Sequence, residues 1–274
     1  MIPATFEYVR ARSVEEAVAL LGEHGDEAKL LAGGHSLLPL MRFRLATPAL
    51  LVDIGRLREL DYVREENGHV AIGALTRHHD VATSPVALAG VPVIAHVAGQ
   101  IGDPQVRHRG TIGGSLAHGD PASDLPAAVL ALGGSLIAQG PRGRREIAAS
   151  DFHLSVFEVA LAPDEVLVEA RIPRAPDGQW GFEKLTKRAQ DWAIVGAVAA
   201  RSGSGVGVAL INMGPVPLRA SAVEAAVAAG ASAARAAELA AEGTDPAADF
   251  NGSVAYRQHV ARVLVRRALE RAGV

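Results

Sequence analysis

Apolar positions recur at helix spacing in some stretches of the chain and alternate with polar positions in others. Ser13 and Glu16 form a capping box ahead of apolar residues that share one helical face, which predicts a helix from Ser13 to Glu23. From Val166 to Ile172, apolar and charged residues alternate as on a half-buried strand. The same reasoning predicts helices over residues 91–101, 123–132, 221–229, 231–242 and 253–271, and strands over residues 29–32, 50–54, 62–64, 69–72, 135–139, 146–148, 180–187, 192–201 and 207–213.

The order of these elements divides the chain into three parts. A predicted hairpin around Asn67-Gly68 opens a second lobe, because that dipeptide favours tight turns between strands. Pro173 to Gly178 is rich in proline and ends in glycine, which is typical of a linker. We therefore predict two lobes at 1–56 and 57–173 and a C-terminal domain at 178–274.

Two segments carry adjacent glycines followed by a hydroxyl residue. The first glycine segment is Ala32-Gly33-Gly34-His35-Ser36-Leu37, and the second is Thr111-Ile112-Gly113-Gly114-Ser115. Glycine lets backbone amides approach a ligand where a Cβ would clash, and amides freed at the start of a helix favour a pyrophosphate. One glycine pair would indicate only a turn, but two similar segments predict cradles that hold one phosphate-bearing ligand from two sides.

Polar residues around the second glycine segment allow other interpretations. Ser115 could be a hydrolytic nucleophile assisted by His118 and Asp120, but the strand and G-x-S-x-G turn of the hydrolases are missing. Arg107 and Arg109 stand just before the segment, where they could bind an anion or cap backbone carbonyls. The sequence leaves these two roles of the arginines open.

A His-His-Asp run, His78 to Asp80, invites a metal-site interpretation. Thr76 is placed to cap a helix that contains this run. Adjacent helical positions point in different directions, unlike the i, i+4 pairs that bind metals. We therefore expect a solvated helix face and no metal site.

Composition excludes several classes of protein. A formal net charge of -3 argues against a general nucleic-acid binder, and no apolar run is long enough to span a bilayer. The chain has 0 cysteines, so it cannot itself hold a thiolate-ligated iron–sulfur cluster. The first residues lack the pattern of a secretory signal, which makes the cytoplasm the expected location.

The two glycine segments, the residues Arg107 to Gly110 that precede the second, and Asp120-Pro121-Ala122-Ser123-Asp124 together resemble the FAD-binding medium subunit of the molybdenum hydroxylases, a group that includes carbon monoxide dehydrogenase and xanthine dehydrogenase. The resemblance covers nearly the full length. It implies an α+β fold with a two-lobed FAD-binding domain of the p-cresol methylhydroxylase/vanillyl-alcohol oxidase type. A C-terminal domain with a three-stranded antiparallel sheet and a helix bundle would follow. The chain departs from many members of the family at Ser115, where they carry Asn and so a second hydrogen-bonding group.

The resemblance also implies residue roles. His35 would contribute position and hydrogen bonds without a covalent bond to flavin, and Asp124 matches the family's flavin-contacting aspartate. Lys184 and Trp192 would approach the isoalloxazine from the C-terminal domain, and no residue is expected to act as a catalytic acid or base. The candidate cofactor-binding residues are Ala32, Gly33, Gly34, His35, Ser36, Leu37, Ile101, Thr111, Gly113, Gly114, Ser115, His118, Asp120, Asp124, Leu161, Leu167, Lys184 and Trp192.

By this resemblance, the chain would be the electron-transfer subunit of a three-part oxidoreductase. A large partner subunit with a molybdenum cofactor would oxidise the substrate. A small [2Fe-2S] partner would pass electrons to FAD on this chain, and an external acceptor would receive them. Two alternatives remain at this point: a stand-alone FAD-dependent oxidoreductase on the same fold, and a non-redox nucleotide-binding assembly subunit.

Overall fold

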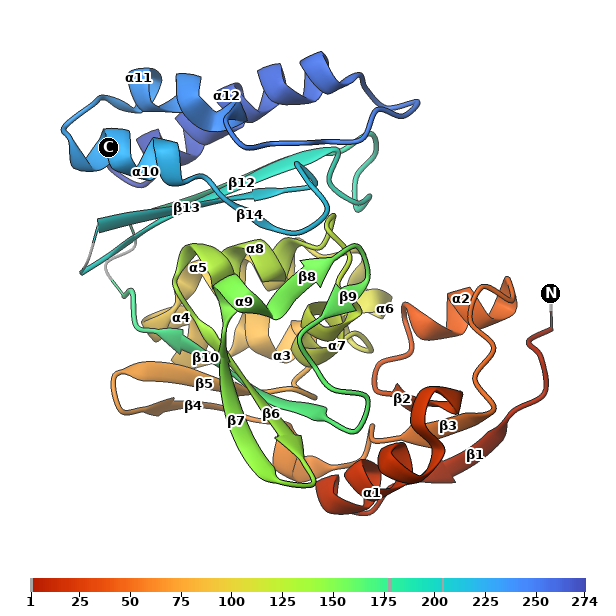
Figure 1. The fold of residues 1–274 in the computed structure, drawn as a ribbon. Coiled ribbons are helices and arrows are strands. Elements are labelled where there is room, and N and C mark those ends of the chain that lie inside the picture. The colour runs from red at the N-terminus through yellow and green to blue at the C-terminus, as the bar shows by residue number, and fades with distance from the viewer. Residues whose placement is uncertain (1, 177–178, 204) are drawn as a thin grey trace.

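In the computed structural model, which describes residues 2–176, 179–203 and 205–274, the C-terminal sheet lies above the central sheet with helices between them, and the N-terminal sheet lies beside the lower edge of the central sheet (Figure 1). The mixture of helices and sheets confirms the α+β class. The end of the predicted linker and the predicted domain start at 178 lie outside the described residues. No helix in the described part of the chain has the length and apolar character needed to cross a bilayer.

The N-terminal part is a small parallel sheet with strand order β1-β3-β2 and helix α1 packed on it. The capping box predicted at Ser13 is present, since the Ser13 side chain accepts a hydrogen bond from the Glu16 amide. Strand β1 was not predicted, because four residues with one apolar pair carry no periodic signal. The elements are β1 Glu7–Arg10, α1 Val14–His24, η1 Gly25–Glu27, β2 Ala28–Leu31, α2 Leu37–Arg42, β3 Leu50–Asp53 and η2 Arg58–Leu60.

The central part is a five-stranded antiparallel sheet with strand order β4-β5-β10-β6-β7. Its strands are β4 Val63–Glu66, β5 His69–Gly73, β6 Ser135–Gly140, β7 Gly143–Ala148 and β10 Val166–Pro173, and a small hairpin pairs β8 His153–Ser155 with β9 Glu158–Val159. Its helices are α3 His78–Thr83, α4 Pro85–Gly90, α5 Pro92–Gly99, α6 Pro104–Arg107, α7 Ile112–His118, α8 Asp124–Ala131 and α9 Ala149–Phe152. The hairpin at Asn67-Gly68 is confirmed, with both residues at positive φ.

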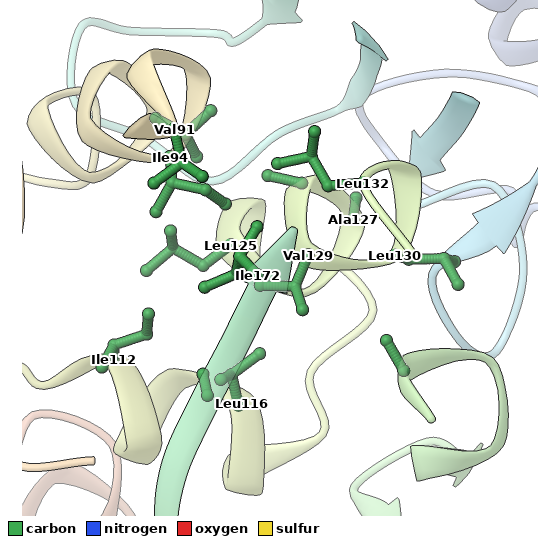
Figure 2. Packing of buried hydrophobic residues seen from close by; sticks show 14 of the residues in the cluster. Val91, Ile94, Ile112, Leu116, Leu125, Ala127, Val129, Leu130, Leu132 and Ile172 are labelled. Atoms are coloured by element: carbon green, nitrogen blue, oxygen red, sulfur yellow. The ribbon is translucent and has the colours of Figure 1, made fainter. Parts of the chain in front are cut away.

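Residues of β10 pack into two different cores, and a register shift between Leu167 and Glu169 interrupts the simple alternation of its side chains. Val166 and Val168 face the core beneath α1, whereas Ile172 packs with the apolar residues of α5, α7 and α8 (Figure 2). The central sheet is therefore covered on both faces near the N-terminal part, and it fixes the two parts relative to each other.

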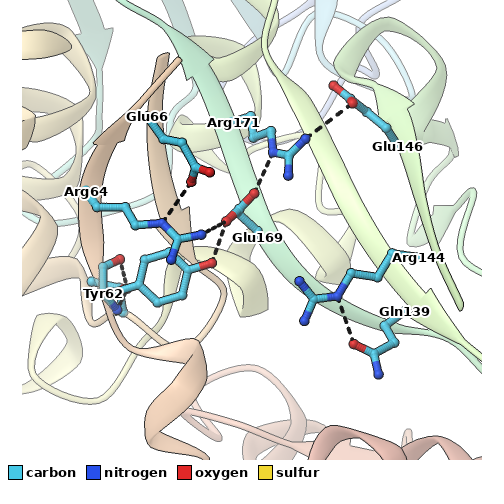
Figure 3. A network of polar contacts seen from close by, with 9 residues as sticks. Tyr62, Arg64, Glu66, Gln139, Arg144, Glu146, Glu169 and Arg171 are labelled. Carbon is cyan, nitrogen blue, oxygen red and sulfur yellow. Dashed lines mark hydrogen bonds and ion pairs between the residues drawn. The ribbon is translucent and has the colours of Figure 1, made fainter. Parts of the chain in front are cut away.

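Glu169, also on β10, is buried at 3% exposure. Tyr62 donates a hydrogen bond to it at 2.5 Å, and Arg64 and Arg171 form ion pairs with it (Figure 3). Burial opposes ionisation, but the hydrogen bonds from Tyr62 and Arg171 outweigh it and hold the pKa of Glu169 below its ordinary value. Tyr62, Arg64 and Arg171 thus compensate the buried carboxylate, which stabilises the sheet.

The C-terminal part is a sheet with strand order β11-β12-β13-β14 and helices on its outer face (Figure 1). Alternate residues of β12 pack outward on these helices and inward on α8, so the strand is buried on both faces. The three predicted strands are present; the two-residue β14 is a fourth that no pattern could reveal. The elements are β11 Trp180–Leu185, β12 Val195–Ser202, β13 Gly205–Ile211, β14 Leu218–Arg219, α10 Ser221–Ala228, α11 Ala233–Ala237, η3 Glu238–Ala241 and α12 Val254–Arg271.

Candidate FAD site

A cavity of about 650 Å³ is lined by all three parts of the chain. Of the eighteen residues named from the sequence, all except Asp120 line it. Asp120 instead accepts a hydrogen bond from the Ala122 amide at 2.8 Å and shapes the turn before α8. A carboxylate could bind a ligand, but the local turn directs this one to a backbone amide instead.

The first glycine segment joins β2 to α2 and presents unpaired backbone amides. Gly34 has φ +77°, a conformation that favours glycine. Within the described residues, none of the amides of residues 33–37 donates to a protein acceptor. The His35 ring lies 3.3 Å from the Gly33 carbonyl oxygen through Nδ1, which holds the imidazole over its own loop. A run of free donors beside a cavity is suited to an anionic ligand.

The second glycine segment is the first turn of helix α7, and its amides are bonded within the protein. Thr111 caps the helix by accepting from the Gly114 amide at 3.1 Å, and the Ser115 amide donates to the Thr111 carbonyl. Gly113 donates its amide to the Ala74 carbonyl at 2.9 Å. The expectation that Gly113 and Gly114 offer unobstructed amides is therefore wrong. Glycine is needed at 113 because an added Cβ would lie 2.5 Å from the Ala74 Cβ.

The two segments meet through the stretch between them. A Cβ on Gly33 would collide with the carbonyl oxygen of Arg109, and the Arg77 guanidinium donates to that same oxygen. Arg107 donates to the carbonyls of Ile101 and Gly102 at 3.0 Å each. Neither Arg107 nor Arg109 lines the cavity, so Arg107 takes the carbonyl-capping role of the two left open.

His78 lines the cavity and is 4% exposed, so the expectation of a solvated helix face is wrong for this residue. Its ring packs against Gly110, where an added Cβ would approach to 2.7 Å, and its amide donates to the Gly110 carbonyl. Burial, followed by the nearby His35 and arginine charges, lowers the pKa of His78 to about 4, so the ring is neutral at pH 7. Thr76 does not cap α3; its hydroxyl bonds the Tyr62 backbone, and Arg77 precedes the helix.

Asp124 and Lys184 form a buried ion pair of 2.7 Å across the cavity wall, between α8 and β11. The other carboxylate oxygen of Asp124, Oδ1, is buried and has no hydrogen-bond partner among the described residues. Burial raises the pKa of Asp124, although the Lys184 ammonium opposes that rise. The pair places one compensated positive charge and one free acceptor at this end of the cavity.

Residues 186–194 connect β11 to β12, and we call them the Trp192 loop. The predicted strand from Trp192 is wrong at its start, because β12 begins at Val195. Gln190, Asp191 and Trp192 line the cavity from this loop, and Trp192 is 59% exposed. An exposed indole beside a cavity is a surface on which a planar ring could stack.

Several lining residues had no signal in the sequence. Backbone folding alone brings Lys29, Leu40, Ile54, Val106 and Glu165 to the cavity, from five separate elements or loops. Among the described residues, no group of three His, Cys, Asp or Glu side chains is arranged to hold a metal.

These features fit a flavin dinucleotide. The volume lies in the usual range of cofactor pockets, roughly 300–1,000 Å³. The free amides of the first glycine segment suit a diphosphate, Asp124 Oδ1 suits a hydroxyl, and Ile54, Leu161 and Leu167 offer apolar surface to a ring system.

Comparison with known proteins gives the family. The model described as FAD binding domain in molybdopterin dehydrogenase matches residues 4–175, and the CO dehydrogenase flavoprotein C-terminal domain matches residues 180–272. The chain belongs to the FAD-binding medium subunits of the molybdenum hydroxylases. It is an oxidoreductase subunit whose cofactor is FAD.

Individual members of the family are similar over their whole length. The chain is 43% identical to the carbon monoxide dehydrogenase medium chain of Hydrogenophaga pseudoflava, covering 99% of this chain and 98% of that one. It is 38% identical to the 6-hydroxypseudooxynicotine dehydrogenase complex subunit alpha of Paenarthrobacter nicotinovorans, covering 99% and 96%. A solved structure of the Hydrogenophaga enzyme, which lacks the Mo-pyranopterin moiety of its molybdenum cofactor, matches with a TM-score of 0.93 at 44% identity over 100% of this chain and 99% of that one.

Proposed function

We propose that this medium subunit binds FAD across the cavity, with the diphosphate at the first glycine segment, and relays electrons within a larger complex. The amides of residues 33–37, which have no acceptor in the part of the chain that the structure describes, carry the proposal, because five adjacent donors without acceptors are costly unless a ligand or water satisfies them. Bound FAD would supply the redox chemistry, accepting electrons and passing them on. The protein would supply position and electrostatics, and no residue would act as acid or base.

The residues that line the cavity would divide the cofactor between them. Residues 32–37 would hold the diphosphate, with Thr111 and Ser115 offering hydroxyls from the other side. Asp124 Oδ1 would accept from a ribityl or ribose hydroxyl, since a carboxylate repels phosphate. Leu161 and Leu167 would pack on a ring, and Trp192 would cover the isoalloxazine from the C-terminal domain.

The ion pair at Asp124 changes what Lys184 is expected to do. An isolated ammonium near the flavin would stabilise the reduced anion, but here a carboxylate 2.7 Å away offsets much of its field. We therefore expect Asp124→Asn to raise the flavin midpoint potential and Lys184→Met to lower it. Spectroelectrochemical titration of the FAD-loaded chain measures both shifts, and potentials that move in the same direction would contradict this account.

FAD binding is tested by titrating the FAD-free chain and following flavin absorbance and fluorescence. We expect binding by the natural chain and by Gly22→Ala, since a Cβ at Gly22 meets nothing within 4 Å. A bulky residue at Gly34 should abolish binding. FMN should bind much more weakly than FAD, because it lacks the diphosphate bridge and the adenylate. Unimpaired uptake of FAD by a folded Gly34→Trp variant would refute the proposed site.

The proposed partners are a large molybdenum-cofactor subunit, a small [2Fe-2S] subunit and an external electron acceptor. The similar proteins resemble this chain throughout, yet their names refer to different substrates, among them carbon monoxide and a nicotine derivative. Chains so alike are suited to a shared electron-transfer role. Substrate choice would then reside on the large partner. Purification from the native host with metal analysis tests the assembly, and a yellow chain that turns over a substrate alone would favour the stand-alone oxidoreductase. We also propose a cytoplasmic location, which cell fractionation tests.

A further inference from the structure

The Trp192 loop is anchored at one end by two residues that lie outside the cavity. The carbonyl oxygens of Ala193 and Ile194, directly after Trp192, each accept hydrogen bonds from side chains of other elements. The Ile194 amide donates to the Leu185 carbonyl at 2.8 Å and closes the base of the loop. The direction in which Trp192 leaves the sheet therefore depends on these contacts.

Asn212 provides the first contact. It follows β13 with φ +59°, and its Nδ2 donates to the Ala193 carbonyl at 2.8 Å and to the Ile194 carbonyl at 3.3 Å. Its own amide donates to the Pro121 carbonyl at 2.9 Å, just before α8. Asn212 thus joins the loop to the segment that carries Asp124.

Arg257 provides the second contact, from helix α12. Arginine is mostly a surface residue, but Arg257 is 2% exposed. One terminal nitrogen donates to the Ile194 carbonyl at 2.5 Å, and the other pairs with Asp249 at 2.8 Å. Burying a guanidinium is costly unless it is paired, and these partners lie on two loops rather than within the helix layer.

We propose that Arg257 and Asn212 form a clamp that positions the Trp192 loop over the cofactor cavity. The proposal rests on the proposed function, in which the cavity holds FAD. Both are positioning residues, since neither lines the cavity. Through Arg257, the C-terminal helix would control how firmly the indole lies against the cofactor.

The first test needs no FAD. The chain has 2 tryptophans, so Trp180→Phe leaves Trp192 as the only indole emitter. In that background we expect Arg257→Met and Asn212→Gly to lower the fluorescence anisotropy of Trp192. Glycine at 212 tolerates the positive φ while removing the donor. Arg266→Met, on the exposed side of the same helix, should leave the anisotropy unchanged.

The second test measures the loaded chain. We expect Arg257→Met to weaken FAD binding by about 5- to 50-fold, the factor expected for the net loss of one or two ordinary hydrogen bonds, and to change the visible circular dichroism of the flavin. Arg257→Lys should rescue part of both effects, since a single ammonium cannot serve Ile194 and Asp249 as the planar guanidinium does. Val265→Ala removes buried methyl groups from the same helix and controls for simple destabilisation.

Equal anisotropy and FAD affinity in Asn212→Gly, Arg257→Met and the natural chain would overturn the clamp. Equal effects of Val265→Ala and Arg257→Met would also overturn it, because a merely structural role predicts them. If Arg257→Met does not fold, Asn212→Gly and Arg257→Lys decide the matter. A natural chain that binds no FAD would refute the proposed function, while the anisotropy test would still report on the clamp.

Discussion

In the first glycine segment the amides of residues 33–37 donate to no acceptor among the described residues, whereas in the second the amides of Gly113, Gly114 and Ser115 are all bonded inside the protein. The sequences look alike because both need glycine, but for different reasons. Gly34 requires a left-handed backbone, and Gly113 requires room beside Ala74. The comparison teaches that a glycine pair beside a cavity can either expose donors or allow two backbones to pack.

The largest loss of stability should come from adding a side chain at Gly113, where the second glycine segment packs against Ala74. Gly113→Ala would place a Cβ 2.6 Å from the Ala74 carbonyl oxygen, where backbone on both sides must move. We expect a loss of about 2–3 kcal/mol in the free energy of unfolding. Urea denaturation measures it, with Gly22→Ala as the control in open space. Equal stability of the two variants would show that the second segment is not packed as described.

The stability of the contact between the two glycine segments, where His78 packs against Gly110, should depend on pH. The pKa of His78 is lowered from 6.5 to about 4 by burial, so between these values the unfolded chain binds more protons than the folded one. Stability is thus retained above pH 6.5 and lost as the pH falls towards 4, by about 2 kcal/mol between pH 7 and pH 5. Denaturation at both pH values should show that His78→Asn removes this part of the slope and that His79→Asn keeps it.

A smaller loss of stability is expected when the left-handed glycines are replaced, and FAD affinity should then distinguish the first glycine segment from an ordinary turn. Gly34→Ala and Gly25→Ala each place a side chain at positive φ, which costs about 1–2 kcal/mol. Gly25 lies at the end of α1 and does not line the cavity. Titration with FAD should therefore show about tenfold weaker binding for Gly34→Ala alone. Equal loss of affinity in both variants would point to general destabilisation.

The smallest change should come from the cap of α7. Thr111→Val removes the hydroxyl that accepts from Gly114, at a cost of about 1 kcal/mol, and Thr111→Ser should restore it. Because that hydroxyl already serves the helix, we expect stability to fall more than FAD affinity does. Thermal denaturation and FAD titration of the same samples make the comparison. A stable Thr111→Val chain that fails to bind FAD would show that the hydrogen bond the hydroxyl donates to the ligand matters more than the cap.

The sequence alone determined the elements whose cause is local. The capping box at Ser13 and the turn at Asn67-Gly68 depend on neighbouring residues, and both are present. The strand predicted from Val166 to Ile172 is also present as β10, but the prediction that it is half-buried is wrong, because residues 166–170 are all buried between two cores. The family motifs also identified the cofactor, because each motif is a short run of residues that can be read directly from the sequence.

Tertiary structure decided which side chains and amides face the cavity. His78 was expected on a solvated helix face, and Arg257 is of a residue type that is mostly exposed, yet distant elements bury both. The Asp124–Lys184 pair joins residues that are sixty positions apart. Local patterns report a residue's own helix or strand, whereas burial and pairing depend on the other elements packed against it. For the same reason, only the packed chain shows that, within the described residues, the amides of residues 33–37 have no acceptor whereas those of Gly113, Gly114 and Ser115 are bonded.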